Sequence, residues 1–498
     1  MNVNPITRLD YPDPDVIRVE DTYYMVSTTM HFMPGCEILQ SFDLVHWEHA
    51  TYVYETLDHT DAQQLKSGQN IYGQGMWAAS LRYHEGRFYI CFVANDTRKT
   101  YLYTSEKIDG PWKKQLIEGF YHDGSLLFDE DGRNYIVYGN DEIWITELNE
   151  DLTAPKKDGL HRLLVSDHKN PELGYEGSHI QKINGYYYIF LVHSLRDRWM
   201  RTEACFYSDS LEGEFTGGDV LCDDRGYCGQ GVAQGGIVDT PDGKWYAMLF
   251  QDSGAVGRIP ILLPVTWKDH FPVFGQNGHV PEEIEVHSTR PGYIYQPLVG
   301  SDDFCNGLLP RWQFNHDPDP RYYHLDALQG TYTITTREVC TELTQAVNTL
   351  TQRMSYPSCA AEVTVDASAL KEGDVAGLCA LQGCYAAVGI TKHHGKYEVL
   401  MLDKKEDGIL DMTEGTVVES HQMDFRLEAD FCNMKDEARC YYRVNKGDWL
   451  PIGTVHKLYF KLDHFTGCRF GLFCYAAEKT GGSACFRDFK YYDVDEIS

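Results

Sequence analysis

The chain has 498 residues, a formal net charge of −30 and 43% hydrophobic residues. This length suits two or three globular domains with sizeable cores, and the hydrophobic content excludes a largely disordered chain. The negative charge argues against nucleic acid and anionic membranes as partners, because phosphate groups attract clusters of Lys and Arg. A neutral ligand such as a sugar remains compatible with it.

The 15 cysteines follow no disulfide or metal-binding pattern. Their number is odd, they are scattered from Cys36 to Cys485, and none stands in a CxxC spacing. The first residues show no basic segment followed by an apolar one, and no apolar run approaches 18 residues. We therefore expect a cytoplasmic protein with reduced thiols.

A short unit recurs five times in the first 290 residues. In each copy a turn residue is followed, three positions later, by Tyr24, Tyr89, Tyr135, Tyr188 or Tyr246. The turns end in Asp21, Gly86, Gly132, Gly185 and Gly243, and their composition favours tight β-hairpins. Successive turns are 46 to 65 residues apart, which is typical of propeller blades of four strands each. Residues 1–290 are therefore predicted to form a five-bladed β-propeller.

Five side chains stand at one shared offset before these turns. Trp77, Asp123, Glu176 and Gln234 each precede a turn glycine by nine residues, and Asp13 precedes the first turn by eight. The strand at this point is the innermost one of a blade and faces the central channel. We therefore expect the five side chains to converge near one axis.

Three of the five are carboxylates, which suggests acid–base chemistry. Carboxylates packed together have their pKa values pushed apart, so one acts as a base while another holds a proton. Glycoside hydrolysis needs such a pair. A calcium site is the competing interpretation, because Asp and Glu clusters also bind Ca²⁺. The aromatic faces of Trp77 and Phe32, together with Arg258 as a hydroxyl-binding group, favour a sugar.

The motifs around these residues resemble those of one known family. In chain order they are Pro12-Asp13-Pro14, Met76-Trp77-Ala78, His122-Asp123-Gly124-Ser125 and Tyr175-Glu176-Gly177-Ser178-His179. Together they resemble glycoside hydrolase family 43, whose members are five-bladed propellers that remove pentoses from xylan or arabinan with inversion. The resemblance implies an exo-acting enzyme that releases α-L-arabinofuranosyl groups from neutral arabinoxylan-derived oligosaccharides, with β-xylosidase activity as the alternative. It implies no cofactor for the chemistry.

The resemblance also implies roles for single residues. Asp13 matches the general base, Glu176 the general acid, and Asp123 the residue that orients the acid and modulates its pKa. Inversion requires the base and the acid to be roughly 6.5–9.5 Å apart, so that a water fits between base and sugar. Arg258 matches a substrate-binding arginine.

Further substrate contacts are predicted, and the chain departs from the family pattern twice. Trp77 and Phe32 are predicted to form walls of the sugar subsites. The usual Trp-Ala-Pro reads Trp77-Ala78-Ala79 here. Gln234 stands where many members carry a histidine that helps to hold a channel ion, which argues against such a metal. We group Gln234 with the substrate-binding side chains.

The second half of the chain has a different pattern. After a predicted linker over residues 291–300, short alternating strands and turns over residues 301–498 indicate a β-sandwich of jelly-roll type. Segments such as 311–316 and 470–473 resemble the concanavalin-like domain appended to family 43 xylosidases, which packs on the propeller and narrows the pocket mouth. Such domains can carry a structural calcium, and Asp303 and Asp488 are candidate ligands.

A more remote alternative is a propeller that binds glycans without hydrolysing them, since this fold hosts many functions. A binding module has no need of acids in three blades at one offset, so the pattern favours the enzyme. The sequence leaves open whether the chain associates with further copies of itself.

Overall fold

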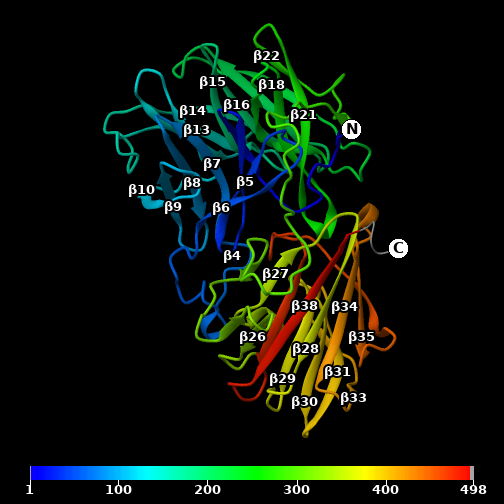
Figure 1. The fold of residues 1–498 in the computed structure, drawn as a ribbon. Helices are drawn as coiled ribbons and strands as arrows, with labels where there is room; N and C mark the ends of the chain where they lie inside the picture. Colours follow the sequence, from blue (N-terminus) through cyan, green and yellow to red (C-terminus); the bar gives the residue numbers. More distant parts are fainter. Residues whose placement is uncertain (1, 494–498) are drawn as a thin grey trace.

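A computed structural model describes residues 2–493 of the chain. Figure 1 shows two bodies, a propeller in the upper part and a sandwich in the lower part. Almost all regular structure is β-strand, with short 3-10 turns at η1 (Lys66–Gly68), η2 (Gly254–Val256), η3 (Leu343–Gln345) and η4 (Cys432–Met434). Within residues 2–493 no helix has the length and apolarity needed to cross a membrane. All 15 cysteines lie in this range, and each is a free thiol.

Five antiparallel sheets of four strands form the propeller. Blade 1 is β2 (Asp15–Val19), β3 (Thr22–Ser27), β5 (Gly35–Ser41) and β6 (Glu48–Tyr54). Blade 2 is β7 (Met76–His84), β8 (Arg87–Ala94), β9 (Lys99–Ser105) and β10 (Lys113–Ile117). Blade 3 is β11 (Ser125–Phe128), β12 (Asn134–Asn140), β13 (Glu142–Leu148) and β14 (His161–Ser166).

Blades 4 and 5 complete the ring. Blade 4 is β15 (Glu176–Ile183), β16 (Tyr186–Ser194), β17 (Arg201–Ser208) and β18 (Thr216–Leu221). Blade 5 is β19 (Val232–Asp239), β20 (Trp245–Asp252), β21 (Arg258–Lys268) and β22 (Phe271–Phe274). The first strands β2, β7, β11, β15 and β19 contact one another in a closed circle around the axis. A small sheet of β1 (Asn2–Val3) and β23 (Glu283–Ile284) ties the chain start to the segment after blade 5.

The repeated turns take two forms. Glu85-Gly86 and Asn184-Gly185 have positive φ at both positions, as a two-residue type I′ hairpin requires. In blades 3 and 5 the strands are instead joined by five residues, because Phe128 pairs with Asn134 and Asp239 with Trp245. The expectation of tight hairpins in every blade is therefore wrong for these two, although the repeat itself is present.

The sandwich consists of a nine-stranded and a seven-stranded sheet. The first holds β24 (Gln313–Asn315), β27 (Leu350–Arg353), β29 (Asp374–Leu381), β30 (Ala386–His393), β31 (Lys396–Lys404), β32 (Leu410–Met412), β33 (Thr416–Val418), β37 (Arg469–Ala476) and, from the propeller half, β4 (Phe32–Met33). The second holds β25 (Tyr323–Asp326), β26 (Thr331–Thr335), β28 (Ser358–Asp366), β34 (Gln422–Asp430), β35 (Glu437–Val444), β36 (Leu450–Lys457) and β38 (Ser483–Asp493). Large apolar side chains such as Trp312, Phe425 and Leu472 fill the core of this domain. The predicted class, a five-bladed propeller followed by a β-sandwich, is confirmed.

The two domains share a built interface. The propeller strand β4 pairs antiparallel with β24 and so extends a sandwich sheet. Glu37 and Arg353 form a buried ion pair at 2.8 Å across the interface. Burial opposes the charge on Glu37, but Arg353 and His49 lower its pKa to about 2. Because one ladder of backbone hydrogen bonds crosses from one domain to the other, the two halves are held in a fixed arrangement.

The predicted linker is not a free tether. The Gln296 N–H donates to Glu48 of blade 1 at 2.8 Å, and the Arg290 guanidinium lies 4.1 Å from the ring centroid of Phe42. The last blade strand ends at Phe274 and the first strand of the sandwich half starts at Gln313. The boundaries at 290 and 300 stay predictions within this interval.

Candidate active site

The five side chains predicted to converge lie at the same end of the innermost strands. Asp13 and Asp123 precede β2 and β11, Glu176 opens β15, and Trp77 and Gln234 lie near the starts of β7 and β19. β-Bulges interrupt the pairing of β7, β15 and β19 at this end. Such bulges redirect side chains next to functional sites.

The backbone is strained at the same level. Asp13, Asp123 and Gln234 have φ of 52°, 47° and 64°, in the left-handed region. A non-glycine residue held there costs on the order of 1–3 kcal/mol, and such residues cluster at active sites. Gly177, directly after Glu176, has φ of 66°, and a Cβ at this position would approach the Gln234 side chain to 2.8 Å. Three of the five converging residues therefore have a left-handed backbone.

Asp13 is a nearly buried carboxylate with two strong partners. Its side chain is 8% exposed, Arg258 Nη1 donates to Oδ1 at 2.9 Å, and the Thr28 hydroxyl donates to Oδ2 at 2.6 Å. Arg258 is itself buried, and among the described residues its Nε and Nη2 have no hydrogen-bond partner. The Phe465 ring covers this guanidinium, so Arg258 does not line the cavity wall.

Asp123 and Glu176 meet at His122. His122 Nε2 lies 3.5 Å from Asp123 Oδ2 and 3.4 Å from Glu176 Oε2. The Gly177 N–H donates to Asp123 Oδ2 at 3.0 Å, and Asn140 Nδ2 donates to Glu176 Oε2 at 2.8 Å. Each carboxylate is therefore oriented by a donor of its own as well as by the shared imidazole.

The electrostatics of this group are unusual. Burial raises the pKa of Asp123 to about 6, with the charges of Glu176 and Asp13 adding to the rise and His122 opposing it. Burial lowers the pKa of His122, but Asp123 and Glu176 outweigh it and bring the value to about 9. At neutral pH an imidazolium therefore stands between the two acids.

The same three residues form a small cluster of potential metal ligands. Within residues 2–493, His122, Asp123 and Glu176 are the one group of three or more His, Cys, Asp or Glu donors that converge, all within 4.8 Å. Calcium takes six to eight oxygen ligands, and two carboxylates with an imidazole do not supply them. These three side chains alone therefore do not complete a calcium site.

A cavity of about 760 Å³ opens above the acids. Its propeller side includes Trp77, His122, Asn140, Glu176 and Arg201, and its sandwich side is made of Met434, Phe460, Lys461, Leu462 and Phe465. The Phe465 ring lies 5.6 Å from that of Trp77, and its centroid is 4.3 Å from the Arg258 guanidinium carbon. The sandwich domain thus forms one wall of the cavity, as the resemblance implied.

Several polar residues of the site were not predicted. They share a second repeated position, at or directly after the end of the second strand of a blade: Thr28, Asn95, Asn140 and Asp252. Asp252 accepts from Arg201 Nε at 2.8 Å and thereby fixes that arginine in the cavity wall. The distance from the hairpin turn to this position varies between seven and nine residues, so only the polar residue that follows each second-strand pattern could have indicated it.

Comparisons with known proteins decide the family. Residues 3–272 match the model described as glycosyl hydrolases family 43, and residues 301–492 match that of the beta-xylosidase C-terminal concanavalin A-like domain. The chain belongs to glycosyl hydrolase family 43. The predicted family and the predicted class of enzyme, a glycosidase, are both confirmed.

Relatives of this family 43 chain carry two kinds of name. A beta-xylosidase of Formosa agariphila is 26% identical over 99% of the chain and 89% of its own length. A non-reducing end alpha-L-arabinofuranosidase of Bacteroides ovatus is 26% identical over 66% of the chain and 63% of its own length. The solved structure of a bifunctional GH43-CE protein from Bacteroides eggerthii matches with a TM-score of 0.92 and 42% identity, over 100% of this chain but 64% of the larger protein.

Of the predicted substrate-binding residues of this family 43 enzyme, Trp77 lines the cavity, and Phe32 lies in the domain interface. Its side chain is 1% exposed, its ring centroid lies 3.5 Å from the Arg469 guanidinium carbon, and it pairs with Asn315 in the shared sheet. It does not line the cavity. The prediction of a subsite wall is therefore wrong, because the segment was recruited to the domain interface.

Gln234 and the two candidate calcium ligands also differ from expectation. Gln234 is 5% exposed, and its N–H donates to the buried Glu203 at 2.7 Å. It lies beneath Gly177 and is not part of the cavity wall, so a direct substrate contact stays a prediction. Asp303 and Asp488 are exposed, and Asp303 Oδ1 accepts from the Cys305 N–H at 2.9 Å. No third His, Cys, Asp or Glu donor converges on them within the described residues, and a calcium site at this pair stays a prediction.

Proposed function

We propose that this family 43 enzyme is an exo-acting, inverting glycosidase that releases terminal α-L-arabinofuranosyl groups, with β-D-xylosyl groups as the second substrate. The observation that carries the proposal is that three carboxylates from three blades lie at the same end of the innermost strands, where one of them, Glu176, lines the cavity. The names of the relatives, which include both pentosidases, support the sugar class. The extra length of the larger structural relative lies outside this proposal.

Glu176 acts as the general acid. It is the carboxyl group that reaches the cavity, with 18% of its side chain exposed, and Asn140 orients it. Asp123, 5% exposed, orients the acid through His122 and the Gly177 N–H. In this assignment Glu176 protonates the departing oxygen of the glycosidic bond.

Asp13 acts as the general base. Arg258 and Thr28 hold both carboxylate oxygens, so the group is fixed in direction while a water approaches the anomeric carbon. The family resemblance assigns Arg258 to binding a sugar hydroxyl next to this water, although its unpaired Nε and Nη2 are buried. The sugar itself then packs on the apolar surface that Trp77 and Phe465 form together, since their rings contact each other.

The test is hydrolysis of 4-nitrophenyl α-L-arabinofuranoside, 4-nitrophenyl β-D-xyloside and arabinoxylo-oligosaccharides. We expect release from both aryl glycosides, faster from the arabinofuranoside, and a product whose anomeric configuration, followed by proton NMR, is inverted. Retention of configuration, or no hydrolysis of any of these substrates, would contradict the proposal.

Variants separate the two roles. Glu176→Gln should lose activity on oligosaccharides but keep more of it on a dinitrophenyl glycoside, which leaves without protonation. Asp13→Asn should lose activity on both and regain it with azide, giving a glycosyl azide of inverted configuration. Asp131→Asn, an exposed acid in a connection of blade 3, is the control and should match the wild type.

A further inference from the structure

A second layer of polar side chains crosses the propeller channel beneath the three acids. We name Asp15, Arg82, Ser125 and His179 the channel layer. Asp15 follows Asp13 by two residues, Ser125 follows Asp123 by two, and His179 follows Glu176 by three. Each acid is thus joined, through one or two residues, to a member of this layer.

Arg82 uses its whole guanidinium to connect four blades. From blade 2, Nη1 donates to Asp15 Oδ2 in blade 1 at 2.7 Å and to its own neighbour Leu81 O at 2.6 Å. Nε donates to Leu126 O in blade 3 at 2.8 Å, and Nη2 donates to Ser125 Oγ at 2.7 Å. Nη2 also donates to Ile180 O in blade 4 at 3.2 Å. One side chain therefore fixes the strands that carry Asp13, Asp123 and Glu176 relative to one another.

Asp15 is the anionic member of the channel layer and is fully buried. Its oxygens accept from the Leu81 N–H at 2.7 Å, from Arg82, and from His179 Nδ1 at 3.1 Å. Burial raises the pKa of Asp15, but Arg82 and His179 outweigh it and the net shift is downward. Without Arg82, this negative charge would lack its main counter-charge close beneath Asp13.

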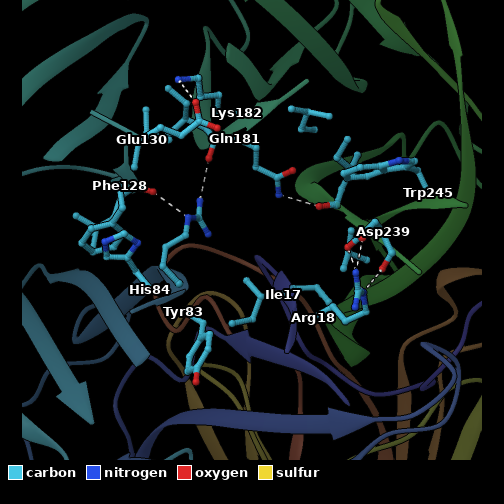
Figure 2. Close-up of a pocket in the computed structure, with 18 residues that line it drawn as sticks. Ile17, Arg18, Tyr83, His84, Phe128, Glu130, Gln181, Lys182, Asp239 and Trp245 are labelled. Carbon is cyan, nitrogen blue, oxygen red and sulfur yellow. Dashed lines mark hydrogen bonds and ion pairs between the residues drawn. The ribbon is translucent and has the colours of Figure 1, made fainter. Parts of the chain in front are cut away.

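The channel layer can be reached from the far end of the propeller. A pocket of about 490 Å³ opens there, and Arg82 is among its lining residues. Figure 2 shows Arg18 turned toward Asp239 at one side of this pocket, and Gln181 on the side opposite Tyr83. Small solutes can therefore approach Arg82 without passing the active site.

We infer that Arg82 is a positioning residue of the hydrolytic reaction, which sets the mutual placement of Asp13, Asp123 and Glu176 by tying blades 1 to 4 beneath them. The inference rests on the proposed function of these acids. Arginine is needed because its planar fork offers five donors in fixed directions, whereas lysine is a single compact charge. Arg82 itself does not touch the substrate cavity.

The experiment compares Arg82→Ala and Arg82→Lys with the matched control Arg18→Ala. Arg18 ties blade 1 to Asp239 of blade 5 in the same far pocket, and among the described residues it makes no hydrogen bond or ion pair with the channel layer. For Arg82→Ala we expect kcat to fall about 100-fold with KM within about threefold, since a misplacement near 1 Å costs this much. Arg82→Lys should recover thermal stability but only a small part of kcat, and Arg18→Ala should keep the wild-type kcat.

Chemical rescue separates positioning from mere folding. Millimolar guanidinium, far below denaturing concentrations, should restore kcat of Arg82→Ala through the far pocket and should not affect Arg18→Ala. All rates are measured well below the Tm of each variant. If Arg82→Ala does not fold, Arg82→Lys and Asp15→Asn are measured in its place, with the same expected loss in kcat.

Three outcomes overturn the inference. The first is a kcat of Arg82→Ala or Arg82→Lys within twofold of the wild-type value. The second is an equal fall in the kcat of Arg18→Ala. The third is an effect of the Arg82 variants on KM alone. An inactive wild-type enzyme would instead contradict the proposed function. An active wild type with an equally active Arg82 variant would contradict only the inference.

Discussion

The propeller and the sandwich contribute different kinds of side chain to one cavity. The propeller supplies every carboxylate and the imidazole that can move a proton there, whereas the sandwich supplies Met434, Phe460, Leu462 and Phe465 and a single charge, Lys461. The five blades direct equivalent positions toward one axis, which suits a set of acids that must act together. The apolar lining is shared, because Trp77, Phe120 and Trp199 come from the propeller and the opposite wall comes from outside the repeat.

This difference shows that the chemistry and the shape of the site are encoded separately. Changes on the propeller side should act on kcat, and changes on the sandwich side should act on binding and on the choice of leaving group. The following predictions test that division, starting with the largest expected effect.

Glu176→Gln removes the proton donor of the propeller side. We expect kcat on oligosaccharides to fall about 1,000-fold, within the range that a general acid contributes, with KM changed little. Both constants are measured from initial rates of sugar release. If this variant lost less activity than the sandwich variant Phe465→Ala, the separation of catalytic and binding roles between the two domains would be contradicted.

Asp123→Asn alters the shared acid without removing its hydrogen-bond acceptor. Because the pKa of Asp123 is raised to about 6, the acid limb of the wild-type pH profile of kcat/KM should lie near this value. We expect kcat/KM of the variant to be about 100-fold lower, by analogy with other acid–base groups. The fall in kcat/KM below about pH 6 should be absent from its pH profile. A limb that stays near pH 6 in the variant would assign it to another residue.

Asp123→Asn should also change the stability of the protein, by an amount that depends on pH. A carboxyl whose pKa is raised on folding holds its proton more tightly in the folded state, so stability falls as pH rises from about 4 to about 6. Asp123→Asn should therefore unfold at a higher Tm than the wild type at pH 8 and at about the same Tm near pH 4. The gain in free energy of unfolding at pH 8 should not exceed about 3 kcal/mol, at about 1.4 kcal/mol per pKa unit.

Phe465→Ala removes the sandwich ring that packs against Trp77 and Arg258. We expect kcat/KM to fall about tenfold, mostly through KM, since an aromatic pair contributes about 0.5–1.5 kcal/mol beyond the area it buries. Phe465→Tyr is the matched control and should stay close to the wild type. A loss confined to kcat would mean that the sandwich also orients the acids.

Leu462 lies at the exposed rim of the same wall and is 71% accessible. Leu462→Ala removes most of this side chain. We expect at most about a twofold change in KM for arabinoxylo-oligosaccharides and none for aryl glycosides, since exposed substitutions away from packed features have small effects. A larger effect on long substrates alone would extend the sandwich contribution to the leaving-group side.

The repeat explains why the propeller side could be predicted so far. Turn chemistry and spacing located Asp13, Trp77, Asp123 and Glu176, because a fixed offset from a hairpin fixes the position of a side chain along an inner strand. The same logic missed Asn140 and Thr28, which lie at the ends of second strands, since only one offset was followed. It also missed the buried role of Asp15, whose partners Arg82 and His179 come from other blades.

The sandwich side could not be located in the same way. Phe465 reaches Trp77 from almost 400 positions along the chain, and no periodicity connects the two. Phe32 lies near the first motif in sequence. Its strand pairs with Asn315 of the sandwich, however, and this pairing places its side chain in the domain interface. Such contacts depend on how two domains dock, which local propensity does not encode.

The short strand β4 matters for experiments that express the sandwich domain without the propeller. Since Phe32 and Met33 cap β24 at the end of the nine-stranded sheet, a sandwich expressed alone would present the edge of β24 to solvent. Unpaired edges invite pairing with other molecules and aggregation. A modular design that exchanges the C-terminal half should therefore carry the 30–35 segment with it, or replace the capping strand by charged or proline residues.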